Sequence, residues 1–140
     1  MFEVILVAVD GSQHGQHAAG VAGDLARAVN ARELHVMAVY EPVPAYVMGP
    51  NLSIAIAARN EQVQQVLRQA QQAIGTIPGT LQPEMVEGSI ADAVLHVAKE
   101  RKCDLIVMGS RGFGRLEGAL LGSNSQKVVS LASCPVLIVH

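Results

Sequence analysis

The alternation of short apolar runs with longer segments of helical periodicity constrains the fold of this chain more than any other feature. Residues 4–9, VILVAV, form an unbroken run of β-branched and aliphatic side chains. Such a run is typical of a strand that is buried on both faces, as in a parallel sheet covered by helices. The pattern predicts strands at residues 4–9, 33–40, 80–88, 104–109 and 135–140, and helices at about 14–30, 52–74, 89–102 and 122–133.

Regular alternation of strand and helix predicts an α/β fold with a parallel sheet and right-handed crossovers. We expect an open, doubly wound, Rossmann-like sheet of five strands in the order 3-2-1-4-5, with helices on both faces. Pro83 removes a ladder donor, so the strand at 80–88 is predicted at an edge of the sheet. The 140 residues suffice for one domain with its own core, so we expect a single domain over 1–140.

Composition and charge argue against several classes of partner. Half of the residues are apolar and 16% are charged, which favours a compact globular protein. A formal charge of −2 and an aromatic content of 3% give no reason to expect nucleic acid or an anionic membrane as partner. The chain shows no signal peptide and no spanning stretch, so a soluble cytoplasmic protein is expected.

The two cysteines, Cys103 and Cys134, are isolated and lack CxxC spacing. The plain interpretation is two reduced thiols in a cytosolic protein, although a disulfide between them stays open at this point.

Unusual residues follow two of the predicted strands, Asp10-Gly11-Ser12 after the first and Gly109-Ser110-Arg111-Gly112 after the fourth. In a sheet of the predicted order, both strand ends open into one crevice, which is where ligands bind in this class of fold. A second glycine motif, Gly122-Ser123-Asn124-Ser125, stands at the start of the predicted helix 122–133. Glycines before a helix start let backbone N–H groups approach an anion, so these favour a phosphate cradle over glycines that serve only turns and packing.

The glycines do not form a Walker A loop, because no GK[ST] follows them, and they do not form GxGxxG. The usual phosphate-binding lysine is therefore missing, and we expect any ATP hydrolysis to be slow.

The spacing Gly109-x2-Gly112-x9-Gly122-Ser123 resembles the signature of nucleotide-binding members of the universal stress protein family. VAVDGS at residues 7–12 and CPVLIVH at residues 134–140 also look like that family, so the resemblance covers the whole chain. It implies an adenine nucleotide α-hydrolase-like fold and the ATP-binding branch of the family, with ATP and Mg²⁺ as the ligands.

The resemblance also implies roles for individual residues. Asp10 would lie near the adenosine, Val39 would contact the adenine, and Gly109 and Gly112 would admit the ribose and phosphates. Gly122, Ser123 and Ser125 would hold the phosphates. Arg111 and Met108, which are neighbours of the glycines, are the remaining candidates. Asn124 stands where many members of the family carry an apolar residue.

An uncovered apolar sheet edge invites pairing with another chain. The strand Val136–Val139 would be such an edge, and many members of the family pair there. We therefore expect a homodimer through this strand, together with a protein partner of unknown identity.

Three functions are open at this point. The first is a regulatory, stress-response module whose nucleotide orders the loops around 41–51 and 109–123. The second is a metal-dependent nucleotide hydrolase or nucleotidyl-transfer enzyme that uses Asp10, although an Asp before Gly is also a common turn residue. The third is an interaction module whose pocket stays empty.

His14 and His17 have the i, i+3 spacing of metal ligands, but without a third ligand a solvated helix face is the better interpretation.

Overall fold

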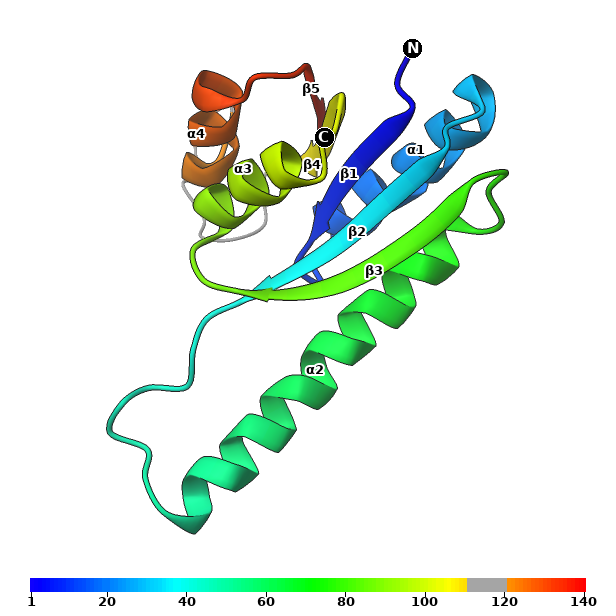
Figure 1. Cartoon of the computed structure of the whole chain (residues 1–140). Coiled ribbons are helices and arrows are strands. Elements are labelled where there is room, and N and C mark those ends of the chain that lie inside the picture. The colour runs from blue at the N-terminus through cyan, green and yellow to red at the C-terminus, as the bar shows by residue number, and fades with distance from the viewer. Residues whose placement is uncertain (111–120) are drawn as a thin grey trace.

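The predicted alternation of strands and helices is confirmed in a computed structural model, which describes residues 1–110 and 121–140 (Figure 1). The strands are β1 (Val4–Val9), β2 (Glu33–Tyr40), β3 (Thr80–Glu87), β4 (Leu105–Gly109) and β5 (Val136–Val139). The helices are α1 (Gln13–Val29), α2 (Pro50–Ile74), α3 (Ile90–Glu100) and α4 (Ser123–Leu131).

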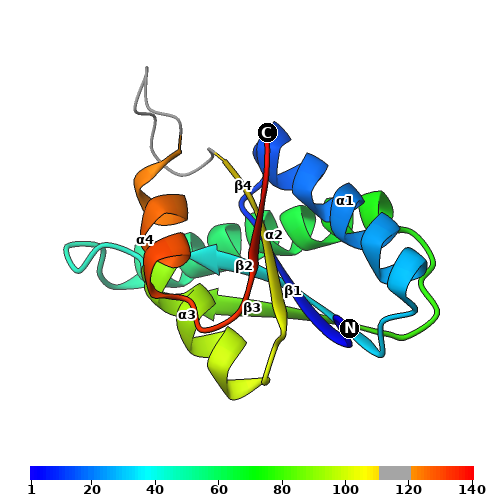
Figure 2. The ribbon, with the colours of Figure 1, turned by 90° about the horizontal axis from the view of Figure 1, so that it is seen from above.

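The sheet has the predicted order, β3-β2-β1-β4-β5, and every neighbouring pair is parallel. β1 is central, with Val7 opposite Val36 of β2 on one side and Val107 of β4 on the other. β3 lies at one edge, where the missing N–H of Pro83 costs no ladder bond to a further strand. β5 forms the other edge, and α1 and α2 cover one face of the sheet while α3 and α4 cover the other (Figure 2).

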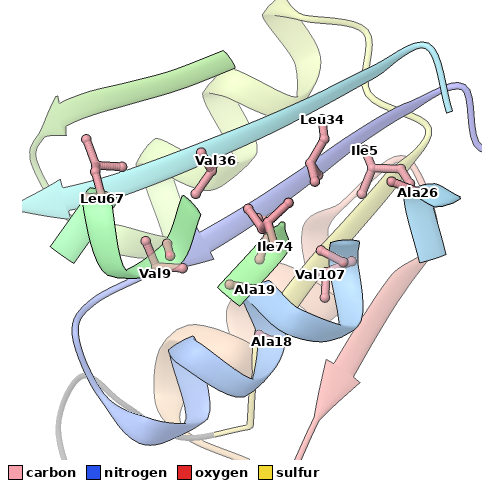
Figure 3. Close-up of a cluster of buried hydrophobic side chains, with 14 of the residues drawn as sticks. Ile5, Val9, Ala18, Ala19, Ala26, Leu34, Val36, Leu67, Ile74 and Val107 are labelled. Atoms are coloured by element: carbon pink, nitrogen blue, oxygen red, sulfur yellow. The ribbon is translucent and has the colours of Figure 1, made fainter. Parts of the chain in front are cut away.

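The apolar run of β1 supplies both halves of the core. Ile5, Val7 and Val9 point into the layer under α1 and α2, where they meet side chains such as Leu34 and Ile74 (Figure 3). The alternate residues of β1, namely Val4, Leu6 and Ala8, belong to a second cluster under α3 and α4. Burial on both faces explains why the run has no polar interruption.

Several element ends differ from the prediction by one or two residues. α2 begins at Pro50 rather than at residue 52, so the predicted loop 41–51 was wrong for its last two residues. Proline suits the first position of a helix because its fixed φ is helical and its missing N–H has no intrahelical partner there. α3 and α4 are each shorter than predicted, ending at Glu100 and Leu131.

Among the helices of the described residues, none has the length and apolar character that crossing a bilayer requires.

Candidate functional site

The carboxyl ends of β1, β2 and β3 open onto two cavities that share the end of β2. The first, the α4 cavity, has a volume of about 400 Å³ and lies between β2, the turn before α3 and the start of α4. Its lining consists of Val39, Tyr40, Glu41, Gly88, Ser89, Ile90, Ser123 and Asn124.

The second, the α2 cavity, has a volume of about 360 Å³ and lies on the other face of the sheet. Its lining consists of Val9, Asp10, Ala38, Val39, Tyr40, Glu41, Arg59, Gln62, Val63 and Val66. Because the two cavities share Val39, Tyr40 and Glu41, the end of β2 is the point where they meet. Of the residues predicted from the sequence, Asp10 therefore lies in the α2 cavity, Ser123 lies in the α4 cavity, and Val39 at the end of β2 lines both.

Asp10 faces the α2 cavity and is held there by the turn that follows β1. Gly11 has φ of 86°, a left-handed conformation that favours glycine, and lets the chain turn back. The Ser12 N–H and hydroxyl both donate to Asp10 Oδ1, the N–H over 2.9 Å. Ser12 in turn caps α1 by accepting from the Gly15 N–H at 3.1 Å. Asp10 is therefore a turn residue in this structure, with Oδ1 already engaged.

The start of α4 forms one wall of the α4 cavity. Gly122 is the N-cap residue and provides no side-chain cap, and the first N–H groups of a helix lack intrahelical acceptors. Ser123 and Asn124 follow and line the cavity. The helix dipole places partial positive charge at this end, so an anionic group is favoured there.

Asn124 joins α4 to α3. Its side-chain oxygen accepts from the backbone N–H of Ala91 at 3.3 Å, in the first turn of α3. Lys127 makes a second link between the helices, with its Nζ 2.9 Å from Asp92 Oδ1. The hydrogen bond from Lys127, and then the one from Ser89, lower the pKa of Asp92. These two contacts link the first turn of α3 to the first half of α4.

Ser125 is 3% exposed, and its hydroxyl donates to the carbonyl oxygen of Gly109 at 2.9 Å. This contact links α4 to the end of β4. The hydroxyl therefore positions the strand end, and its proton is engaged in the hydrogen bond to Gly109. Met108 is buried in the core cluster under α3 and α4 and lines neither cavity.

Two predicted residues, Arg111 and Gly112, lie outside the described residues. The residues that flank that segment are held together, because the N–H of Gly122 donates to the carbonyl oxygen of Ser110 at 2.8 Å. The N–H of Ser110 also donates to the carbonyl oxygen of Val139 in β5 at 2.8 Å. The chain therefore leaves β4 and enters α4 at one point beside the cavity.

Sequence reasoning missed Tyr40, Glu41 and Arg59. The guanidinium of Arg59 lies 4.5 Å from the centre of the Tyr40 ring, a cation–π distance, and brings a positive charge to the α2 cavity. Tyr40 and Glu41 could have been found by applying the strand-end rule to β2 as well. Arg59 carries no local signal, because it reaches the cavity only through the tertiary placement of α2.

His14, His17 and His140 line a further pocket of about 300 Å³ at the start of α1. His17 Nδ1 lies 2.8 Å from the main-chain oxygen of His140. Within residues 1–110 and 121–140, no group of three His, Cys, Asp or Glu side chains is placed to hold a metal ion.

Both cysteines are free thiols. Burial, with a smaller effect from Cys134, raises the pKa of Cys103 to about 12, and burial also raises the pKa of Cys134.

Because the thiolate is the reactive form, we expect both thiols to react with a disulfide reagent at pH 8 far more slowly in the folded protein than in denaturant. Release of the reagent's chromophore, followed with and without denaturant, measures this. Equal rates in the two states would contradict the burial of these side chains.

The whole chain, residues 1–140, matches the model of the universal stress protein family. A relative from Thermus aquaticus, the universal stress protein in QAH/OAS sulfhydrylase 3'region, is 45% identical over 140 residues, which is the full length of both chains.

Solved structures agree with this match. Universal stress protein UspA from Lactobacillus plantarum has a TM-score of 0.85 at 28% identity, covering 99% of this chain and 98% of its own. A universal stress protein in complex with cAMP has a TM-score of 0.77 at 30% identity, covering 99% of this chain and 97% of its own. The chain therefore belongs to the universal stress protein family.

Proposed function

We propose that this protein is a cytoplasmic, nucleotide-dependent regulatory module that binds ATP with Mg²⁺ at the carboxyl edge of its sheet. The observation that carries the proposal is the α4 cavity, in which an apolar strand end, Val39, lies across from the uncapped start of α4 at Ser123. An apolar surface facing an anion-binding helix start suits a ligand with a flat base and a phosphate tail. The family member in complex with cAMP supports an adenine nucleotide as the class of ligand.

In this proposal the adenine lies against Val39, the adenosine lies near Asp10, and the phosphates lie at Gly109, Gly122 and Ser123. Asn124 and Ser125 act as positioning residues, since their side chains bond to Ala91 and Gly109 and fix the start of α4. Phosphates supply most Mg²⁺ ligands in nucleotide sites, with one or two carboxylates added. Asp10 lines the α2 cavity and the start of α4 lines the other one, so in this proposal the phosphates themselves hold the Mg²⁺.

Slow hydrolysis at most is expected, because the Walker A lysine is missing and the described part of the chain brings no free lysine to the start of α4. Lys127 is paired with Asp92, and Asp10 Oδ1 is engaged by Ser12. The nucleotide then acts as a regulator, and its presence alters the surface that a protein partner reads. A turnover of many ATP per second would contradict this part of the proposal.

The test of the proposal is mass spectrometry of gently purified protein, first native and then denatured. A stoichiometric adenine nucleotide is expected, and its identity distinguishes a module that holds ATP from an enzyme left with its product. Protein that is empty and also fails to bind added ATP with Mg²⁺ would overturn nucleotide binding.

Replacing Asp10 by Asn separates a regulator from an enzyme. Asn keeps an oxygen that can accept from Ser12 but removes the charge, so the turn should survive. We expect the affinity for ATP to fall several-fold. Any slow turnover of ATP should fall only as much as the lower occupancy of the site by ATP explains. Affinity and turnover are measured by calorimetry and phosphate release, and the finding of intact affinity with lost turnover would instead identify a hydrolase.

We also propose a homodimer through β5. The strand lies at an edge of the sheet, and Leu137 is 37% exposed while Val139 is buried. Backbone groups on the open side of such a strand can pair with a second copy. A single-chain mass by light scattering at micromolar concentration would contradict this dimer.

A further inference from the structure

The first half of α2 and the loop before it extend away from the rest of the molecule (Figure 1). The first buried side chain of α2 is Val63, although the helix begins at Pro50. We call residues 42–58 the apolar arm. α2 thus continues for several turns past the sheet with no core of its own to cover.

The apolar arm contains no charged residue. Within its helical part, Leu52 and Ile56 lie on one side, while Ile54 lies about 200° around the helix from Leu52, given 3.6 residues per turn. Alanines occupy positions 55, 57 and 58, and the polar residues of this part are the uncharged Asn51 and Ser53. A helix with apolar side chains on opposite sides is stable when it is buried, so this largely apolar segment resembles the inside of an assembly.

The exposed area is large enough for a specific interface. Tyr46 is 83% exposed, Met48 73% and Ile54 67%, and Leu52 and Ile56 are each more than one-third exposed. Large side chains present about 150–250 Å² each when fully exposed, so one arm offers on the order of 600 Å². Complete burial of two arms would remove about 1,200 Å² from solvent, which reaches the lower limit for stable protein interfaces.

We infer that the apolar arm is a docking surface for the same arm of a second copy of this chain. A two-fold interface puts the same patch on both subunits, which an uncharged patch tolerates without like-charge contacts. A lipid surface is the weaker occupant, because membrane-surface helices carry Lys and Arg on a polar face and this arm has none. The inference does not rest on nucleotide binding, and it concerns a different surface from β5.

The test compares three variants by light scattering at about 1–100 µM, the range in which moderate interfaces form. Ile54→Lys/Ile56→Lys places charge in the arm, where both side chains are exposed in the isolated chain. Gln72→Lys adds charge at an exposed position near the other end of α2 and is the matched control. Leu137→Lys places charge in β5 and separates the two interfaces.

We expect the arm variant to have half the wild-type mass at equal concentration, with Gln72→Lys unchanged. This two-fold change is expected for a dimer becoming a monomer, or for a tetramer becoming a dimer if β5 pairs as well. An arm variant with the wild-type mass, or a wild type that is monomeric throughout, overturns the inference. Co-sedimentation of monomeric wild type with phosphatidylcholine vesicles, lost in the arm variant, overturns it in favour of a lipid surface.

Hydrogen exchange of the unmodified protein gives a second test that needs no variant. Backbone amides of residues 52–58 should exchange more slowly at 100 µM than at 1 µM, since pairing protects them, while amides of the central strand β1 should show no such dependence. Exchange of the arm that is independent of concentration overturns the inference, whatever β5 shows.

Discussion

Gly122→Glu is expected to weaken ATP binding by at least a hundredfold, or about 2.7 kcal/mol. Gly122 is the N-cap of α4, next to Ser123 in the wall of the α4 cavity. A carboxylate at this position meets the phosphates with like charge and competes with them for the free N–H groups of the helix start. Titration calorimetry with ATP and Mg²⁺ measures the loss.

The matched control is Gly122→Ala. The residue has φ of −66° and ψ of 161°, which any amino acid adopts, so alanine adds a methyl group without strain or charge. We expect alanine to cost affinity much less than glutamate, and both variants to show the wild-type circular dichroism spectrum. Wild-type affinity in the glutamate variant would place the phosphates elsewhere, and unchanged binding of a protein partner by that variant would favour an interaction module that works without nucleotide.

Gly23→Ala is expected to destabilise the protein by about 2–3 kcal/mol, because extra atoms in a close-packed contact force the backbone apart. A Cβ atom at Gly23 would lie 2.9 Å from Ile74 Cα and closer still to the Ile74 carbonyl oxygen. Both are main-chain atoms that cannot turn aside, and the same carbonyl accepts from Arg27 at 2.7 Å. The melting temperature should fall by about 5–10 °C.

Gly20→Ala is the control on the same helix. A Cβ atom at Gly20 has Ala73 O as its nearest neighbour, at 3.9 Å, which is an ordinary contact. Alanine also favours a helix over glycine by about 1 kcal/mol. Gly20→Ala should therefore raise the melting temperature, whereas Gly23→Ala, three residues away, should lower it, as thermal unfolding would show. Similar melting temperatures for the two variants would contradict the close approach of α1 and α2.

The fold was predictable because its constraints are local. The uninterrupted run VILVAV requires burial on both faces, and Pro83 excludes an interior strand, which together leave few sheet orders. The start of α2 was missed because the prolines of residues 41–51 indicate a loop, while Pro50 in fact serves as the first helical residue.

The site was predictable only in part, because its contacts depend on tertiary placement. The sequence indicates Asp10 and Ser123 as strand-end and helix-start residues, and both line cavities. No sequence pattern shows that the Ser125 hydroxyl turns inward to Gly109, or that Arg59 returns to the end of β2 after a long connection. The assignment of the phosphates to Gly122 and Ser123 stays a prediction.

The central position of β1 also affects how the chain is made. β1 leaves the ribosome before the other strands of this sheet, yet its neighbour β4 begins only at Leu105. At about 5–20 residues per second, synthesis leaves one edge of this apolar strand unpaired for several seconds. The nascent chain therefore depends on whatever shields VILVAV during that interval, and conditions that slow translation between β2 and β4 should lower the yield of folded protein before any change in its final stability.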